Sequence, residues 1–243
     1  AAVDQVLIEN CRFEGQAFKG EGNKTRELIQ IEPGSIKGYP YTKVQDVRPT
    51  TNVVIRNCYF GGSEKSPQYM VGLGNHGQQN GVKCSDILIE NCTFENAAWA
   101  GIRFWAFDRV SIKNNTFRMT ADSGQKERYA ILADSHPYGA VIEEGGAAST
   151  SELVIEKNTI VIEAPDVKAV GVLGNGGSPK KPKDISIMNN TIQSNGAEQA
   201  IELLRTENCV IEGNQVEGFE TQVYAEDCDG EVKTDLEIIY NEK

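Results

Sequence analysis

The chain has 243 residues, and its 35 acidic and 24 basic side chains give a formal net charge of −11 at pH 7. This balance argues against nucleic acid as a partner, because nucleic-acid binding needs a basic stripe. No stretch approaches the roughly 18 consecutive apolar residues of a membrane span, so the sequence predicts none.

In chain order, one short phrase recurs: apolar-x-Ile-x-Asn, then Asn or Cys, then x and Phe or another apolar residue. The copies lie at Val6–Phe13, Val53–Phe60, Ile87–Phe94, Val110–Phe117, Leu153–Ile160, Ile185–Ile192 and Cys209–Val216, with a degenerate copy at Leu236–Asn241. A second apolar strand follows each copy, at Leu28–Glu32, Met70–Gly74, Gly101–Trp105, Ala130–Asp134, Val170–Gly174, Ile201–Arg205 and Gln222–Glu226. Apolar and polar residues alternate with a period of two, which is strand chemistry.

A repeat of roughly 20 to 50 residues indicates a stacked array. Short strands joined by turns at fixed offsets predict an all-β fold, a parallel β-helix solenoid of about seven coils with almost no α-helix. A leucine-rich horseshoe lacks its Leu-x-x-Leu-x-Leu signature here. A sandwich of antiparallel sheets lacks repeated Asn-Gly hairpin turns.

The polar position of the phrase predicts a column of stacked side chains. Asn tolerates the left-handed backbone of a sharp turn, and its amide can bond to the coils above and below. We expect such a ladder from Asn10, Asn57, Asn91, Asn114 and Asn189. The next positions form a second row, of Cys11, Cys58, Cys92, Asn115, Asn158, Asn190 and Asn214, and an aromatic stack follows from Phe13, Phe60, Phe94 and Phe117.

The repeated phrase resembles the right-handed parallel β-helix superfamily of pectate-lyase-like proteins, which includes polysaccharide hydrolases and phage tailspikes. A narrower stretch, Glu27 to Phe117, resembles bacterial and phage β-helix proteins of poorly defined activity. The resemblance implies the fold over nearly the whole chain but not one activity. The Asn-Thr-Asp, Asp-Asp and Arg-Ile-Lys signatures of polygalacturonases and the Asp-Pro-His pattern of alginate epimerases are absent.

The six cysteines are expected to be free thiols. Cys11, Cys58 and Cys92 share one repeat position, and a set of three cannot pair off within itself, so a buried row is the expected arrangement. No Cys-x-x-Cys or His-x-x-x-His spacing indicates zinc. The sequence predicts no cofactor and leaves a Ca²⁺ site open.

The long connections all leave the second strand, at 33–51, 75–85, 135–151 and 175–184, so their bases gather along one sheet edge. Alternation places two rows on that sheet's outer face. One row reads Gln30, Gly72, Arg103, Leu132, Gly171, Glu202 and Tyr224, and the next reads Glu32, Gly74, Trp105, Asp134, Leu173, Leu204 and Glu226. His76 and His136 lie just beyond these strands.

This face is the candidate ligand groove. Trp105 at an outward position suggests a platform for a sugar ring, although a covering loop would account for it equally well. Gly72 and Gly74 suggest a dip where ligand approaches backbone, or tight packing under a loop. The residues assigned to substrate binding are Arg103, Trp105, Gly72, Gly74 and Asn75.

The catalytic candidates are Glu32, His76, Asp134 and His136. A glycoside hydrolase needs two carboxyl groups about 5 to 9.5 Å apart. Glu32 and Asp134 are three coils apart, roughly 14 Å, so each needs a loop partner such as Asp46, Glu143 or Glu144. A polysaccharide lyase needs a base and a positive group, which a histidine and Arg103 supply. Lys180 to Lys183 form a local basic cluster that is either a patch for an anionic substrate or a solvated turn.

Residues 1–243 are expected to form one β-helix domain, excised from a longer protein, because little remains at either end to cap the solenoid. The expected location is extracellular, on a cell surface or a virion, although no signal peptide is recognisable. Three functions stay open: a carbohydrate-active enzyme acting on a polysaccharide, a non-catalytic glycan-binding or receptor-binding module of a surface or phage protein, and a structural spacer. The expected partners are a glycan, a larger parent protein, or two further copies in a homotrimer if the chain is phage-derived.

Overall fold

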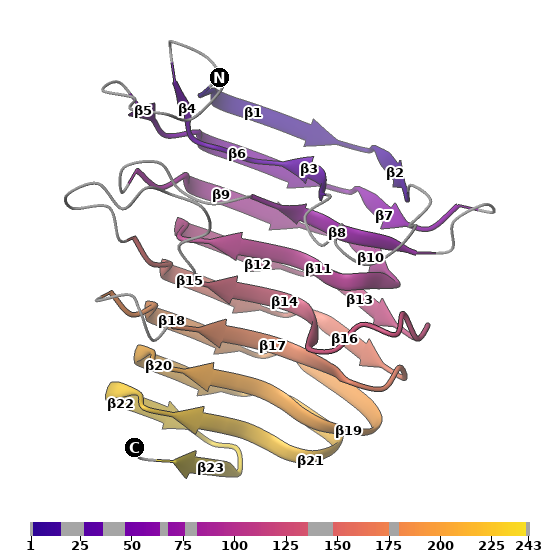
Figure 1. Cartoon of the computed structure of the whole chain (residues 1–243), viewed down its shortest axis with the longest axis vertical. Helices are drawn as coiled ribbons and strands as arrows, with labels where there is room; N and C mark the ends of the chain where they lie inside the picture. The colour runs from indigo at the N-terminus through magenta and orange to yellow at the C-terminus, as the bar shows by residue number, and fades with distance from the viewer. Residues whose placement is uncertain are drawn as a thin grey trace.

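The chain forms a parallel β-helix in the computed structural model, which describes residues 2–15, 27–35, 47–63, 68–75, 82–135, 148–174 and 180–241. Figure 1 shows the coils stacked from the N-terminus at the top to the C-terminus at the bottom. No described residue is helical. Every strand pair except one short antiparallel pair, β4 (Gly34–Ser35) with β5 (Val47–Arg48), is parallel, which confirms the predicted fold.

One face of the solenoid is an eight-stranded sheet, called sheet A here. Its strands are, in spatial order, β1 (Asp4–Glu9), β6 (Thr51–Arg56), β9 (Ser85–Glu90), β12 (Asp108–Lys113), β15 (Ser151–Glu156), β18 (Lys183–Met188), β20 (Glu207–Glu212) and β22 (Asp229–Thr234). The recurring phrase builds this sheet and the turn after it. The degenerate eighth copy was misplaced: β22 is the eighth strand, whereas β23 (Ile238–Asn241) pairs with β21 (Gln215–Glu226) in the other sheet.

The rest of each coil belongs to a larger sheet, called sheet B, which bends into two arms. The short arm holds β2 (Arg12–Glu14), β7 (Tyr59–Gly61), β10 (Thr93–Glu95), β13 (Thr116–Met119) and β16 (Thr159–Ile162). The long arm holds β3 (Glu27–Gln30), β8 (Tyr69–Gly74), β11 (Ala97–Trp105), β14 (Arg128–Asp134) and β17 (Val167–Leu173). Strands β19 (Thr191–Leu204) and β21 run through both arms without a break.

The interior is a continuous apolar core built by alternation. In β9, for example, Ile87 and Ile89 are buried, while Leu88 and Glu90 between and after them are partly exposed. The predicted aromatic column is confirmed: the rings of Phe13, Phe60, Phe94 and Phe117 are stacked in sequence, with centroids 5.0, 4.5 and 4.9 Å apart. Ile160, Ile192 and Val216 continue it in register.

Small residues on the long arm face this column. Gly72, Gly101, Ala130, Ala169 and Ala200 are neighbours in register. A Cβ added to Gly72 would lie 3.0 Å from the ring of Phe94, and one added to Gly101 would lie 3.0 Å from the ring of Phe117. Glycine therefore occurs where the next coil has Phe, and alanine where it has an aliphatic side chain.

The sharp turn after each sheet A strand has the left-handed backbone that the sequence predicts. Asn10, Asn57, Asn91, Asn114 and Asn189 have φ values of 53 to 55°. Their side chains are exposed, however, so the expectation that this row is a buried ladder in which Asn91 and Asn114 stack is wrong. The turn conformation directs these side chains outward.

The amide ladder lies one residue further along, in the interior. Its members are Asn115, Asn158, Asn190 and Asn214. Each side-chain oxygen accepts a hydrogen bond at 2.9 Å from the backbone N–H of the row's residue in the preceding coil. The Nδ2 of Asn115 donates to the carbonyl of Ile89 at 3.0 Å, and that of Asn158 donates to the carbonyl of Ile112 at 2.9 Å.

Cysteine extends the same row toward the N-terminus. All six cysteines are free, and Cys58 and Cys92 are buried as predicted, whereas Cys11 in the first coil is exposed. The Cys92 thiol accepts from the backbone N–H of Cys58 at 3.4 Å and donates to the carbonyl of Ile55 at 3.7 Å. The Cys92 thiol therefore makes the same two contacts as the amide of a ladder asparagine, over the longer distances that sulfur allows.

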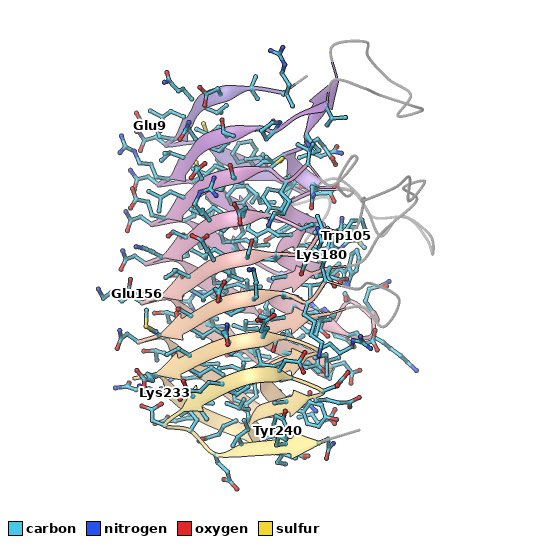
Figure 2. All side chains as sticks on the ribbon, turned by 90° about the vertical axis from the view of Figure 1, so that its left-hand side faces the viewer. Glu9, Trp105, Glu156, Lys180, Lys233 and Tyr240 are labelled. Carbon is cyan, nitrogen blue, oxygen red and sulfur yellow. The ribbon has the colours of Figure 1, made fainter. Side chains whose placement is uncertain are left out.

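The outer face of sheet A carries a row of residues that are all charged except Met188, called the charge row here. Glu9, Arg56, Glu90, Lys113, Glu156, Met188 and Glu212 follow one another in register. Arg56 lies 2.7 Å from Glu9, and Lys113 lies 3.9 Å from Glu156. Figure 2 shows Glu9 and Glu156 along the same edge of the solenoid.

Candidate functional site

The register of the long arm places the predicted site residues, with one correction. Arg103 pairs with Gly74 rather than Gly72, because Ile102 pairs with Leu73 and Ala100 with Val71, after an irregularity between Ala97 and Ala100. The outer row therefore reads Gln30, Gly74, Arg103, Leu132, Gly171, Glu202 and Tyr224. The predicted alignment of this coil is wrong by two residues, and the sequence does not reveal such a shift because Val71 and Leu73 are both apolar and either can be set opposite Ile102.

Arg103 is the centre of this face, yet it is fully buried. Its Nη2 lies 2.5 Å from a carboxylate oxygen of Glu27, whose side chain is also buried, and donates to the carbonyl of Asn75 at 2.8 Å. Its guanidinium carbon lies 4.0 Å from the ring centroid of Trp105 and 4.5 Å from that of Trp99. The cation is therefore held by one ion pair and two aromatic faces.

Trp105 is 2 % exposed, so the expectation of a solvent-exposed platform is wrong. Asn75 fixes its backbone on both sides: the Trp105 N–H donates to Asn75 Oδ1 at 2.8 Å, and Asn75 Nδ2 donates to the Trp105 carbonyl at 2.9 Å. Three predicted binding residues, Asn75, Arg103 and Trp105, thus do come together. They form a packed unit, called the Arg103 cluster here together with Glu27 and Trp99.

Glu32 and Asp134 border the Arg103 cluster and are partly exposed. Asp134 pairs with Trp105 in register, and Glu32 lies on the coil of β3, three strands from β14. Burial lowers the pKa of Arg103, and the negative charges of Glu27, Asp134 and Glu32 act against that shift. Three carboxylates therefore offset the cost of burying one guanidinium.

Neither glycine leaves an open dip. Gly72 faces the interior, and a Cβ at Gly74 would lie 2.5 Å from the Arg103 carbonyl and 3.3 Å from Cγ of Glu27. The tight-packing alternative for both positions is the one that the structure supports. His76 and His136, and the proposed loop partners Asp46, Glu143 and Glu144, lie outside the described residues.

A second polar group occupies the outer face further down the long arm. The hydroxyl of Tyr129 donates to Glu202 at 2.8 Å, and the ammonium of Lys168 lies 2.6 Å from the other oxygen of Glu202. Burial raises the pKa of Tyr129, and the charge of Glu202 raises it further. The tyrosine therefore stays protonated and serves as a donor. It is not a base at neutral pH.

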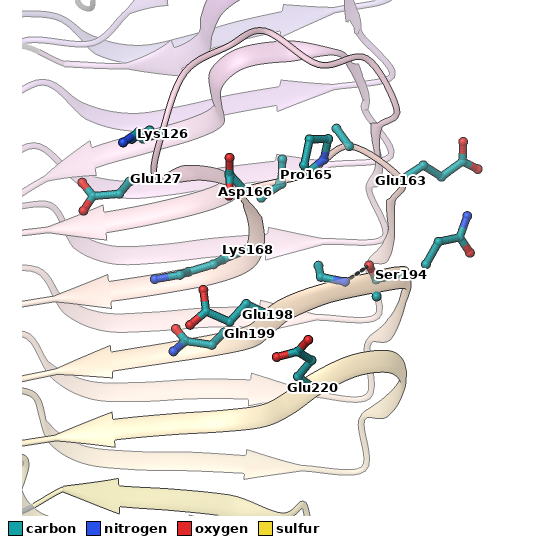
Figure 3. A pocket seen from close by; sticks show the side chains of 15 residues that line it. Lys126, Glu127, Glu163, Pro165, Asp166, Lys168, Ser194, Glu198, Gln199 and Glu220 are labelled. Carbon is teal, nitrogen blue, oxygen red and sulfur yellow. Dashed lines mark hydrogen bonds between the residues drawn. The ribbon is translucent and has the colours of Figure 1, made fainter.

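Beside this group lies a pocket of about 790 Å³ at the bend between the arms. Figure 3 shows the carboxylates of Glu127, Asp166, Glu198 and Glu220 around it, with Lys168 among them. Within the described ranges, no group of three or more Cys, His, Asp or Glu side chains is arranged to hold a metal ion. The part of the chain that the structure describes also contains no helix of the length and hydropathy needed to cross a membrane.

Sequence reasoning missed Glu27 and Trp99 in the Arg103 cluster, and Lys168 beside Tyr129. Glu27 pairs with Val71 and Val71 pairs with Ala100, so Glu27 lies two strands from β11 and level with a residue three positions before Arg103. The alternation in Glu27–Gln30 marks Glu27 as a strand residue, but it does not tell which strand neighbours it.

A family model identifies the class of protein to which the chain belongs. Residues 2–161 match the family model described as right handed beta helix region, and the chain belongs to that family. The predicted handedness is therefore confirmed.

One curated protein and two solved structures are similar to the chain. The chain is 33 % identical over 254 aligned residues to the plasmin and fibronectin-binding protein A of Streptococcus pneumoniae, covering 99 % of this chain and 35 % of that protein. It is also similar to a crystal structure of PfbA, a surface adhesin of Streptococcus pneumoniae, with a TM-score of 0.81 and 29 % identity, covering 98 % of this chain and 55 % of the other. A further structure of the same adhesin gives a TM-score of 0.75 and 27 % identity over 98 % of this chain and 61 % of that chain. The chain thus spans about a third of the curated relative.

Proposed function

We propose that this chain is a non-catalytic binding module of a bacterial surface adhesin, and that it binds plasmin, fibronectin or both. The observation that carries the proposal is the 33 % identity to a plasmin and fibronectin-binding protein across 99 % of the chain. The packing of the Arg103 cluster supports it, because a buried ion pair under two indoles is a rigid scaffold and not an open reaction centre.

Surface plasmon resonance tests this proposal. Purified chain is passed over immobilised plasmin, fibronectin and, as a control, ovalbumin. We expect saturable binding to at least one of the first two and none to ovalbumin. Equal responses on all three surfaces, or none on any, contradict the proposal.

A second candidate is the polysaccharide-binding or polysaccharide-cleaving protein that the sequence suggests. The observation that favours it is the position of Glu32 and Asp134, both partly exposed on one face and both acting on the charge of Arg103. A glycan array tests binding, and release of reducing ends or of unsaturated products tests cleavage. For a cleaved glycan, Asp134→Asn should lower turnover while binding is retained, whereas unchanged turnover contradicts a catalytic Asp134.

A further inference from the structure

A basic pocket of about 500 Å³, called the lysine pocket here, opens at the N-terminal ends of the sheet A strands. Four lysines line it, Lys83, Lys180, Lys181 and Lys183, against the two carboxylates Glu207 and Asp229. The lining thus carries two more positive than negative charges on a chain whose formal net charge is −11. Anions in solution, which the acidic remainder of the surface repels, are attracted to a locally basic site of this kind.

The register explains why lysines distant in sequence meet here. Cys84, Phe107, Thr150 and Pro182 occupy one column, since the residue after each donates its N–H to the carbonyl of the preceding coil's member. Lys83 and Lys181 each directly precede a member of this column. Ser149, which precedes Thr150, therefore lies one coil from Lys181 and two coils from Lys83.

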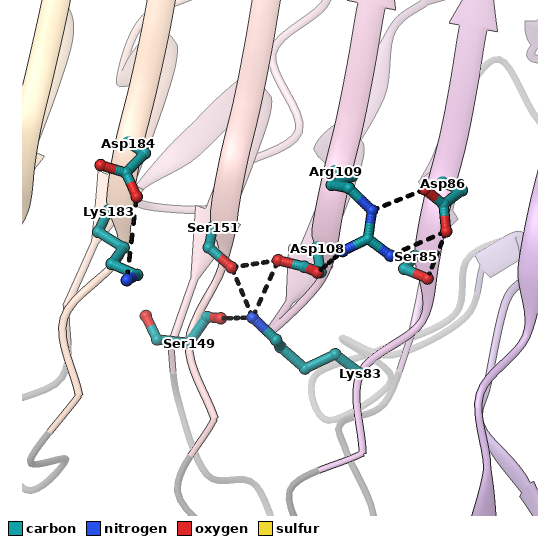
Figure 4. Close-up of polar contacts among 9 residues, drawn as sticks. All are labelled: Lys83, Ser85, Asp86, Asp108, Arg109, Ser149, Ser151, Lys183 and Asp184. Atoms are coloured by element: carbon teal, nitrogen blue, oxygen red, sulfur yellow. Dashed lines mark hydrogen bonds and ion pairs between the residues drawn. The ribbon is translucent and has the colours of Figure 1, made fainter.

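Two of the lysines are fixed by neighbours. The Lys83 ammonium donates to Ser151 Oγ at 2.5 Å and to the Ser149 carbonyl at 3.2 Å, and it lies 3.2 Å from Asp108, as Figure 4 shows. Lys181 lies 2.7 Å from Asp229. Both side chains are mostly buried, so their positions are set before any ligand arrives.

Lys183 differs from these two. Its nitrogen lies 3.9 Å from Asp184, too far for a hydrogen bond, and its side chain is 54 % exposed. The charge of Lys183 is therefore available to a ligand at the cost of one weak surface contact.

Two buried hydroxyls of residues that line the pocket supply the second observation. Ser149 is 6 % exposed and Thr150 is fully buried, and neither side-chain oxygen has a hydrogen-bond partner among the described residues. Buried hydroxyls in proteins are normally paired. An oxygen acceptor inside the pocket would pair both.

We propose that the lysine pocket binds the oxyanion group, a carboxylate or a sulfate, of an acidic sugar. Lys183 and the hydroxyls of Ser149 and Thr150 donate to the oxyanion, while Glu207 and Asp229 accept hydrogen bonds from sugar hydroxyls at the opposite wall. A volume of about 500 Å³ lies in the range of about 300 to 1,000 Å³ typical of small-molecule sites. A lone inorganic anion would leave much of that volume unfilled. The proposal does not depend on plasmin or fibronectin binding.

Calorimetry at constant ionic strength tests the proposal with sodium glucuronate, glucose and sodium sulfate as probes. We expect the unsubstituted chain to bind glucuronate and not glucose. Tighter binding of glucuronate than of sulfate supports a site for the whole acidic sugar. A chain that binds sulfate as tightly as glucuronate, or that binds neither, overturns the acidic-sugar assignment.

Three variants distinguish binding in the lysine pocket from nonspecific attraction of the anion to surface lysines. Lys183→Gln and Ser149→Ala should each weaken glucuronate binding about tenfold, since each removes a hydrogen bond to a charged group. The matched control is Lys233→Gln, whose lysine is 57 % exposed and paired with Glu212 elsewhere on sheet A. It should leave binding unchanged.

Ser149→Ala also distinguishes a ligand contact from a structural one. Because this hydroxyl has no partner among the described residues, its removal should leave the melting temperature of the free chain unchanged or raised. Equal weakening of binding by Lys183→Gln and Lys233→Gln, or unchanged binding in Ser149→Ala, overturns the assignment.

Discussion

The N-terminal coils and the later coils fill the same two columns of side chains with different chemistry. The row that follows the turn asparagine holds Cys11, Cys58 and Cys92 in the first three coils and asparagine from Asn115 onward. The aromatic column holds phenylalanine in the first four coils and aliphatic side chains from Ile160 onward, so the fourth coil combines Asn115 with Phe117. Each half balances its own volumes, with glycine opposite Phe and alanine opposite Ile or Val. One backbone thus accepts two core solutions, one dominated by stacking and the other by hydrogen bonds.

Cutting the amide ladder should give the largest difference between the halves. Asn158 accepts from the N–H and Nδ2 of Asn115 and donates to the carbonyl of Ile112 and to Asn190. Asn158→Ala should lower the free energy of unfolding by about 3 kcal/mol, because several buried groups lose their partners. Urea denaturation measures it. The control Asn114→Gly, at an exposed left-handed turn, should change it by less than about 0.5 kcal/mol, and equal losses in both variants would show that the ladder is not special.

Adding one methyl group to the small-residue column should cost less. Gly101→Ala places a Cβ 2.7 Å from the Ala130 carbonyl and 3.0 Å from the Phe117 ring, so about 2 kcal/mol of overpacking is expected. Phe117→Ile in the same chain converts this pair to the alanine and isoleucine pair of the later coils. A double-mutant cycle should therefore show partial recovery, and simple additivity of the two changes contradicts the matched-volume explanation.

Extending the asparagine row by one coil should cost less still. Cys92→Asn keeps an acceptor for the Cys58 N–H and a donor for the Ile55 carbonyl, so the free energy of unfolding should change by less than about 1 kcal/mol. Cys92→Val offers neither group and should cost about 1 to 3 kcal/mol. Thermal melts compare them, and a Val variant as stable as the Asn variant would mean that packing alone matters at this position.

The smallest expected effect is the loss of folding stability at alkaline pH that follows from ionisation of the buried thiols. Burial raises the pKa of Cys92, and likewise of Cys84 and Cys209, to about 12. A thiol ionises at a lower pH in the unfolded chain, so the stability that these groups contribute is complete below about pH 9 and is lost as pH rises toward 12. Denaturant midpoints from pH 7 to 11 measure the decline, which Cys92→Ala should make shallower.

A thiol reagent at pH 8 should label Cys11 in the folded chain and reach Cys92 only on unfolding, so rapid labelling of Cys92 in the folded chain would contradict its burial.

Period-two alternation and the recurring Asn predicted the solenoid and the Phe column because both follow from local pattern. The pattern could not tell that Asn114 points outward and Asn115 inward, since two adjacent amides are equally plausible in sequence and only the left-handed turn separates them. The predicted register of the long arm is wrong by two residues at Gly72, because either Val71 or Leu73 can be aligned with Ile102 on apolar grounds alone. Asn75, Arg103 and Trp105 lie together as their strand positions predict, but the burial of Trp105 and Arg103 depends on packing that no periodicity encodes.

The charge row favours stacking of the coils in the correct order. Along Glu9, Arg56, Glu90, Lys113 and Glu156 the sign of the charge reverses at every coil. A chain that skipped one coil would bring Glu9 against Glu90, or Arg56 against Lys113, so an omission meets repulsion where the correct order meets attraction. Because the apolar residues of the repeats are so similar, the coils could stack in the wrong order if the apolar core alone decided. The alternating charges disfavour a wrong order, whereas the interior columns do not.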